Sequence, residues 1–499
     1  MSGAPRMLAQ RGGVVGFLCA AFLAGCAGFP GKQKPVALPS AAPISGLDQT
    51  AGGAWPEREW WHRFADPTLN ALIDQAIATA PTLATAHARF DSARETVREA
   101  GAASGARVDF VGDAERQRLS DNGIISFFPA SLSPGFNWYN QFDLGLRASY
   151  TFDWWGKQRA LVESAVDQAH AAQAERSAAA LSLESAIADT YFGWQADQAR
   201  LALARERLAV VQREGLIAAQ RVRAELDSAE NLHKAESATA LVQEQIAGLE
   251  GSAQLRIVAL AALVGRPAAE LPPLVARPLP TFPADLPDNV RLDLISRRAD
   301  ITASRWRVEA AERRLDSARA EFYPDLSINA LAGLNSLTSS KLLEYGSRAP
   351  SAGIAIHLPI FDAGRLKAQY RGAEFLIDAA VSTYDQAIVD AARDVATQVA
   401  TRSQIAAERS QRLIQLGAAE QLQKSEAARV RQRVADLRAE LVATEATMQQ
   451  RDALLQLDAA ALSNDISLQR ALGGGYERPA SLADSNSVDV HSLNSQSQP

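Results

Sequence analysis

The sequence predicts a mixed α and β fold, with four membrane β-strands per chain and a long α-helical coiled coil. Three observations lead to this prediction. A secretion signal ends in a cysteine, one segment alternates apolar and polar residues, and long proline-free stretches follow the predicted strands in both halves of the chain.

The composition favours extended helices over a compact globule. The 499 residues are 47% hydrophobic but only 6% aromatic, and much of the apolar content is alanine, a strong helix former that builds a thin core. The formal net charge is -6 and is spread along the chain. This argues against a nucleic-acid partner, which usually requires a concentrated basic patch.

The N-terminal segment, 1–25, reads as a signal peptide. Arg6 and Arg11 precede a short apolar stretch, too short for a membrane span, which ends in Leu23-Ala24-Gly25-Cys26. This ending resembles a bacterial lipobox, which implies a covalent lipid on Cys26 and outer-membrane sorting. A signal that merely contains a cysteine is the alternative. Residues 26–54 are rich in Pro, Ser, Ala and Gly and are predicted to be a lipid-anchored tether.

The remaining chain divides into two similar halves. The first repeat covers 55–265, a Pro-rich linker covers 266–287, and the second repeat covers 288–475. Each repeat reads as a helix, two strands and a long helical hairpin. Arg221-Val222-Arg223 and Arg429-Val430-Arg431 illustrate the fixed offset, which indicates internal duplication. The polar tail 476–499 is predicted to be disordered.

The strands are expected near 105–119, 140–153, 324–336 and 352–361. From Gln141 to Phe152, apolar and polar residues alternate, as in a tilted membrane strand with one face toward lipid. The first strand has the weakest pattern. A soluble, half-buried sheet would give the same alternation.

The helical hairpins are expected at 157–264 and 363–471. Asp153 and Asp362 precede them and are suitable N-caps. The first proline-free stretch could form a rod of about 100 Å. In the last helix, apolar residues recur every seven positions, which is typical of a coiled coil: Val434, Leu441, Met448, Leu455 and Leu462.

Four strands cannot close a barrel, and an open sheet edge is not tolerated in lipid. No segment after the signal has about 18 consecutive apolar residues, so a membrane helix is not expected. Three copies would supply an even set of about 12 strands and a pore. A homotrimer in outer-membrane lipid, extending into the periplasm, is therefore predicted.

Several motifs, taken in order, resemble the outer-membrane efflux family of TolC/OprM-like outer-membrane factors, close to its NodT-like lipoprotein branch. They are Trp60-Trp61-x-x-Phe64-x-Asp66-Pro67, Arg297-Arg298-Ala299-Asp300-Ile301, Ala318-Arg319-Ala320-Glu321-Phe322-Tyr323-Pro324, Pro359-Ile360-Phe361-Asp362-Ala363-Gly364-Arg365 and Ala471-Leu472-Gly473. The resemblance implies a trimeric channel that works with a periplasmic adaptor protein and an inner-membrane pump, in a tripartite system for small molecules.

The hairpin tips depart from the pattern of that family. Glu225 and Arg433 stand where the family usually has glycine. The resemblance implies that charged tip residues form a periplasmic gate or the adaptor-docking surface. The candidates are Glu225, Asp227, Glu230, Asp436, Arg438 and Glu440. The alternative is that each is an ordinary solvated residue of a helix turn.

Other classes of function are less well supported. The six histidines lack the spacing of metal ligands, and no nucleophile or phosphate-binding motif occurs, so no catalytic residue, metal or cofactor is expected. A channel for protein secretion stays open. So does a structural periplasmic lipoprotein without a pore, and a lipid-anchored enzyme is a distant third.

Overall fold

A computed structural model describes residues 54–118, 138–280 and 297–477. The predicted signal, Cys26 and most of the tether and tail lie outside these residues. The chain forms two compact units: unit 1 from residues 92–118, 138–169 and 306–381, and unit 2 from 54–91, 170–280, 297–305 and 382–477. Each unit takes segments from both halves of the sequence.

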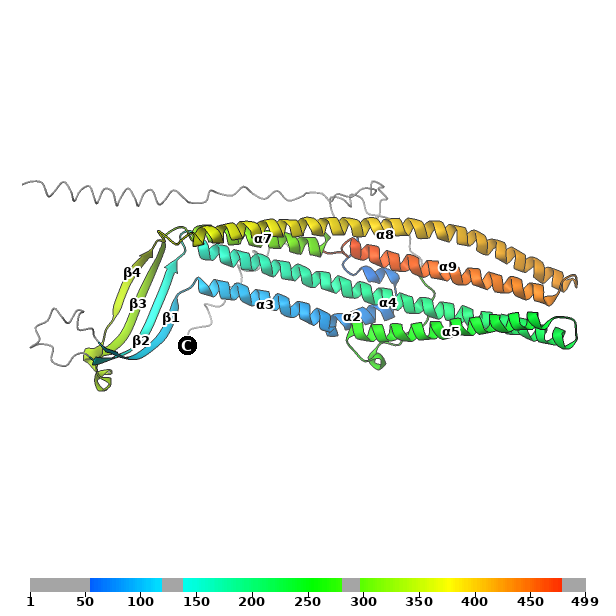
Figure 1. Cartoon of the computed structure of the whole chain (residues 1–499), viewed down its shortest axis with the longest axis horizontal. Coiled ribbons are helices and arrows are strands. Elements are labelled where there is room, and N and C mark those ends of the chain that lie inside the picture. The colour runs from blue at the N-terminus through cyan, green and yellow to red at the C-terminus, as the bar shows by residue number, and fades with distance from the viewer. Residues whose placement is uncertain (1–53, 119–137, 281–296, 478–499) are drawn as a thin grey trace, which may run out of the picture. The chain divides into compact units, whose positions relative to one another are not determined.

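Unit 1 contains one antiparallel sheet with the strands in chain order (Figure 1). The strands are β1 (Arg107–Arg118), β2 (Trp138–Phe152), β3 (Asp325–Ser336) and β4 (Ser351–His357). They lie where the sequence predicts strands, but β4 ends before the expected residue 361. Pro359 explains the early end, because a proline has no N–H for a strand ladder.

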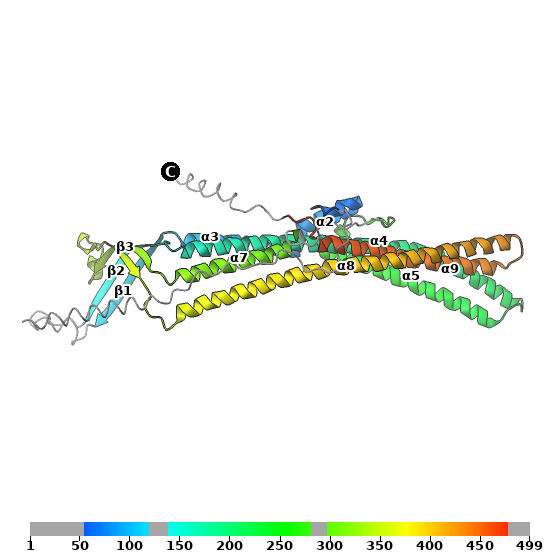
Figure 2. The same ribbon diagram turned by 90° about the horizontal axis from the view of Figure 1, so that it is seen from above.

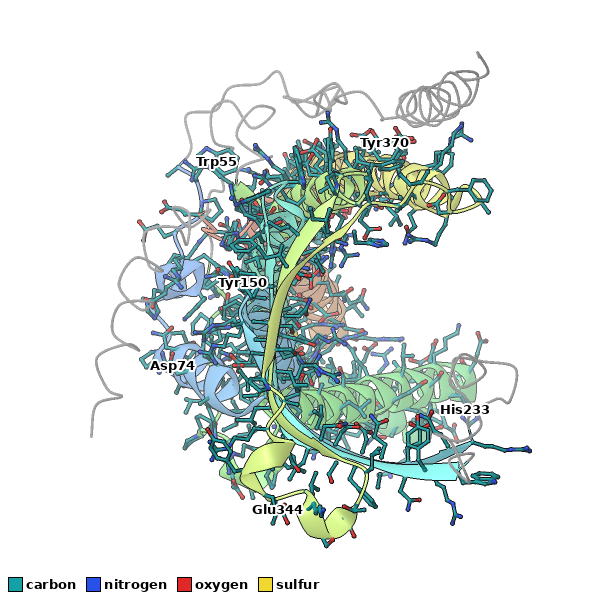
Figure 3. The ribbon with its side chains drawn as sticks, turned by 90° about the vertical axis from the view of Figure 1, so that its left-hand side faces the viewer. Trp55, Asp74, Tyr150, His233, Glu344 and Tyr370 are labelled. Carbon is teal, nitrogen blue, oxygen red and sulfur yellow. The ribbon has the colours of Figure 1, made fainter. Side chains whose placement is uncertain are left out.

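The register gives the sheet two chemically different faces. Phe110 pairs with Leu146, Tyr150 with Ile328, and Ile328 in turn with Ile354. Directly opposed residues share a face, so the even-numbered residues of all four strands lie together. Figure 3 shows the sheet as a curved layer, with Tyr150 labelled on β2. The even-numbered face is the apolar one, and it includes the poorly patterned β1.

In unit 1, the two predicted caps stabilise the N-terminal ends of the two longest helices. Asp153 Oδ2 accepts a hydrogen bond of 2.8 Å from the backbone N–H of Arg159, at the start of α4 (Lys157–Arg223). Asp362 Oδ2 accepts a bond of the same length from Leu366 in α8 (Arg365–Arg431). Beside them, α7 (Ala299–Ala320) and α8 share an apolar cluster of Leu315, Tyr370, Ala373 and Ile377.

Unit 2 holds the two helical hairpins, formed by α4 with α5 (Ala229–Val264) and by α8 with α9 (Leu437–Ala471) (Figure 2). The order of neighbours is α5, α4, α9, α8. One charged pair represents each contact: Arg205–Glu250 for α4 with α5, Arg200–Asp452 for α4 with α9, and Arg409–Asp458 for α8 with α9. Helices α5 and α8 therefore occupy the two edges of this layer.

The N-terminal segment of unit 2 is more divided than the sequence suggests. The sequence predicts a single helix at the start of the first repeat. The structure has three elements there: η1 (Trp60–Phe64), α2 (Pro67–Thr79) and α3 (Pro81–Ala103). Pro81 explains the break, because it disfavours helical backbone at Ala80. Asp66 caps α2 by accepting from the N–H of Thr68, and Tyr191 donates to its other oxygen at 2.7 Å.

Among the residues that the structure describes, one helix, α5, is long and apolar enough to cross a membrane, judged by length and composition alone. The helix has no unbroken apolar run of that length, because Glu250, Gln254 and Arg256 interrupt its apolar part. Only 17% of its most apolar window is buried within the chain. Much apolar surface of α5 is thus uncovered in a single copy.

A buried carboxyl makes the stability of unit 2 pH-dependent. Burial raises the pKa of Glu184 to about 7, and the neighbouring Trp60 and Arg58 oppose part of that rise. Because the folded state holds the proton more tightly, the stabilisation is full below about pH 4.5 and is lost as the pH rises through about 7. Glu184→Gln should therefore raise stability at pH 8 by about 2–3 kcal/mol, measured as the unfolding midpoint in detergent.

The matched control is Glu206→Gln, on an exposed position of the same helix. It should leave the midpoint unchanged at both pH 8 and pH 5. An equal gain for both variants, or a gain for Glu184→Gln that does not shrink toward pH 5, would contradict the assignment.

Candidate functional site

The two hairpin tips have the same backbone conformation. Glu225 and Arg433 both adopt left-handed backbone, with φ of 56° and 60°. In both tips the next residue donates its N–H to a carbonyl five residues earlier, at 2.9 Å: Leu226 to Arg221, and Val434 to Arg429. Glycine is the residue that adopts this geometry without strain. The duplicated turn thus persists although both glycines of the family pattern are replaced.

Val434 belongs to this turn and not to the heptad series of the last helix. It precedes α9, which begins at Leu437, and it is 64% exposed. Leu226 is similarly 69% exposed in the first tip. Each tip therefore presents one apolar side chain beside one charged residue. The charges are opposite, Glu225 in the first tip and Arg433 in the second.

Ion pairs join the two tips within one chain. Arg221 Nη1, near the end of α4, lies 3.0 Å from Asp436 Oδ2 in the second tip, and Arg221 Nε lies 3.4 Å from Asp227 Oδ2 in the first. Arg438 at the start of α9 lies 3.3 Å from Glu214 of α4 and 3.7 Å from Asp227. These five residues are called the tip network below. It gives the two hairpins a shared set of contacts.

Asp227 lies at the centre of the tip network, and its side chain is only 13% exposed. Its Oδ1 accepts a bond of 2.6 Å from the Asn231 amide and one of 2.9 Å from the Ser228 N–H. These bonds, aided by the charges of Arg221 and Arg438, lower the pKa of Asp227. The carboxylate is thereby kept charged opposite two guanidinium groups.

The other predicted residues have different surroundings. Glu230 pairs with Lys234 one turn along α5, at 2.5 Å, and this contact lowers its pKa. Glu440 lies in the first turn of α9, where a negative charge is favourable. Within residues 54–118, 138–280 and 297–477, no ion pair involves Glu225 or Glu440. The structure thus brings Asp227, Asp436 and Arg438 together and leaves the other three candidates apart.

Sequence reasoning misses two members of the tip network, Arg221 and Glu214. In the sequence, Arg221 stands out only as part of the repeated Arg-Val-Arg motif. Its counterpart Arg429 pairs within α8, with Glu426. The repeat therefore gives no indication that Arg221 forms an ion pair with the other hairpin. Glu214 lies two helical turns before the tip, and only the packing of α4 against α9 brings it to Arg438.

The contacts of the tip network are ion pairs between arginine and carboxylate side chains. Among the residues whose structure is described, no group of three or more His, Cys, Asp or Glu side chains could hold a metal ion. The tip network contains two guanidinium groups and three carboxylates, all engaged in ion pairs. What it can do chemically is to hold two helix ends together reversibly.

The family model for outer membrane efflux proteins matches residues 72–266 and 291–474, one segment in each half of the chain. Together these segments cover most of the chain. The chain belongs to the outer membrane efflux protein family. The resemblance drawn from the sequence motifs is thereby confirmed.

Relatives of known description agree with this membership. The multidrug resistance outer membrane protein MdtP of Shigella flexneri is 31% identical over 439 residues, which cover 86% of this chain and 88% of that protein. The putative multidrug resistance outer membrane protein MdtQ of Escherichia coli K12 is 30% identical over 460 residues, which cover 90% of this chain and 92% of that protein.

Solved structures show the same fold. The outer membrane protein VceC of Vibrio cholerae is 32% identical, with a TM-score of 0.74 over 85% of this chain and all of that one. The outer-membrane channel OprN is 25% identical, with a TM-score of 0.79 over 91% of this chain and all of that one. The efflux protein therefore has the fold of the trimeric outer-membrane channels, with a β-barrel and a helical periplasmic barrel, and it lies in the outer membrane.

Proposed function

We propose that this channel is the outer-membrane conduit of a tripartite efflux system and exports small molecules. The proposal includes a periplasmic adaptor protein that docks at the hairpin tips and an inner-membrane pump that supplies the energy. Its relatives MdtP and MdtQ are named as multidrug resistance proteins, which favours small molecules over secreted proteins. Transport along such a conduit requires a path and no chemical step.

The tip network is the single observation that best supports a gated conduit. Arg221 and Arg438 hold the tips of both hairpins of one copy together. Threefold symmetry would repeat these contacts around the axis. Ion pairs between partly exposed groups form and break at little net cost, so they suit a closure that an adaptor can open. In this proposal, Asp227, Asp436 and Arg438 serve the gate.

The remaining candidates are assigned to docking. Glu225 is exposed and lies beside the exposed Leu226, and Glu230 and Glu440 follow in the first turns of the returning helices. An adaptor that contacts the first tip would meet an apolar side chain and negative charge. One that contacts the second tip would meet Val434 and the positive charge of Arg433.

Single-channel conductance of the purified trimer in a planar bilayer tests the conduit, and drug susceptibility of a strain lacking its own efflux channel tests the cargo. Small or brief current steps, together with restored resistance when a cognate adaptor and pump are supplied, are expected. Conductance without restored resistance would favour protein secretion. A trimer without any conductance would leave a structural lipoprotein and contradict the proposal.

The lipid anchor on Cys26 is part of the proposal and makes a separate prediction. Cys26→Ser should abolish incorporation of labelled palmitate, because the acylated thiol is lost, while Cys19→Ser, within the predicted signal, should not. Acyl chains strengthen membrane attachment but do not form the pore. Retained labelling of the Cys26→Ser protein would refute the lipobox assignment.

A further inference from the structure

Helix α5 has an uncovered apolar face on the side away from α4. Val242, Leu249 and Leu260 are buried toward the chain's own core. On the opposite side, Leu241 is 58% exposed and Leu255 is 70% exposed. Residues seven apart share a face of a helix, so Gly248 lies between these two leucines.

Gly248 leaves a gap in this face. A Cβ built on it would have no neighbouring atom within 4 Å among the residues that the structure describes. The face of Leu241, Gly248 and Leu255, called the α5 face, therefore has two large side chains around a recess. It belongs to the helix whose apolar window is mostly unburied in a single copy.

Helix α8 has a corresponding face on the side away from α9. Arg409 and Arg412 point toward α9, where they bond to Asp458 and Gln450. The opposite side carries Ala407, Ile414 and Gly417. Ile414 is 64% exposed, and a Cβ at Gly417 would again find no described atom within 4 Å. These three residues are called the α8 face, and here one large side chain lies between two small ones.

The order of helices in unit 2 identifies the partner of both faces. Since α5 and α8 are the edge helices of the layer, neither has a second neighbour from its own hairpins. In a closed threefold ring each edge must meet the other edge of the next copy. The α5 face of one copy thus lies toward the α8 face of another, and this follows from the trimeric fold, not from the proposed pump or adaptor.

The two faces also match in height. The ion pair of Arg221 with Asp436 places both tips of one copy at the same level, so heights can be measured along each helix from its tip end, where α5 begins and α8 ends. From the helical rise, Gly248 lies about 28 Å and Ile414 about 26 Å from these ends.

The flanking residues of both faces follow the same register. Leu241 and Gly417 lie about 18 Å and about 21 Å from the tip ends of their helices. Leu255 and Ala407 lie about 39 Å and about 36 Å from them. At each level a large side chain is opposite a small one.

We propose that the α5 face of one copy packs against the α8 face of the next, with Ile414 inserted over Gly248. This contact is the seam between copies in the helical part of the channel. Leu241 covers Gly417, and Leu255 contacts Ala407. Helices packed across small residues approach closely, which limits leakage between copies while the gate residues act at the tip.

Disulfide cross-linking of the full-length protein in its native membrane tests the seam. In the double variant Gly248→Cys with Ile414→Cys, mild oxidation should link most copies into dimers and trimers on a denaturing gel. Leu241→Cys with Gly417→Cys is a second in-register pair, which keeps the test valid if one double variant assembles poorly. Each single variant should stay monomeric on the gel.

The matched control is Gly248→Cys with Lys424→Cys. Both residues are on the same helices, but they are about 18 Å out of register, so cross-linking should fall by at least about tenfold. Equal cross-linking of this control, or none in both in-register pairs of an intact trimer, would overturn the proposal. Conductance of the same preparations separates the outcomes: a conducting trimer without the cross-link contradicts the seam and leaves the proposed function in place.

Discussion

Arg221→Gln should open the channel at rest. The substitution removes the charge that joins Asp436 to Asp227 while keeping a side chain of similar length. Minor states of two-state proteins are commonly populated at about 0.1–10%, so losing this contact should raise the resting open fraction on the order of tenfold. Single-channel current in a planar bilayer measures the change. Because exposed pairs are screened, high salt should also raise the resting open fraction of the wild-type channel.

The repeat supplies the control. Arg429→Gln changes the equivalent position of the second tip, whose guanidinium pairs with Glu426 of its own helix. It should leave the resting current as in the wild type. If both glutamine variants leak equally, the tip network is not the gate.

Leu146→Arg should prevent stable assembly in the outer membrane. Leu146 is near the middle of β2, 52% exposed, on the face that it shares with Phe110 and Ala332. An arginine facing lipid near the middle of a barrel strand costs about 2–4 kcal/mol. Three symmetry-related copies incur this cost together. The yield of heat-resistant trimer in outer-membrane fractions should therefore fall by more than about tenfold.

Ser149→Arg, three residues later on the same strand, tests the direction of the two faces. It adds the same side chain to the odd-numbered face, where Arg107 and Asn329 are its partners in register. Trimer yield should stay near that of the wild type, and the ion selectivity should shift toward anions. The reverse ranking of the two variants would mean that the faces are assigned the wrong way round.

Much of the fold is predictable because two periodicities are strong in this chain. The alternation in β2 and the proline-free stretches identify the strands and both hairpins to within a few residues. The face of β1 is not predictable in this way, since Val111 and Arg116 interrupt its alternation, and it follows only from the pairing of Phe110 with Leu146. Pro81 is visible in the sequence, but the helical pattern on both sides of it conceals the break between α2 and α3.

The candidate site is predictable only in part. Acidic and basic residues near a turn can be found in the sequence, and Asp227, Asp436 and Arg438 are examples. Their partners Arg221 and Glu214 depend on which helices are neighbours, and local pattern contains no information on that. For the same reason the two edge faces of α5 and α8 resemble ordinary solvated surface until the order of the four helices is known.

The interleaving of the two halves has a consequence for biogenesis. In the centre of the sheet Phe152 pairs with Leu326, and Phe142 pairs with Ser336. These partners are far apart in the chain, and long-range pairing of this kind slows folding. Until the second half has crossed the inner membrane, only β1 and β2 are present, and a two-stranded hairpin is marginally stable alone. The sheet must therefore form after translocation, and a nascent chain in the periplasm would need protection of its apolar strands until β3 arrives.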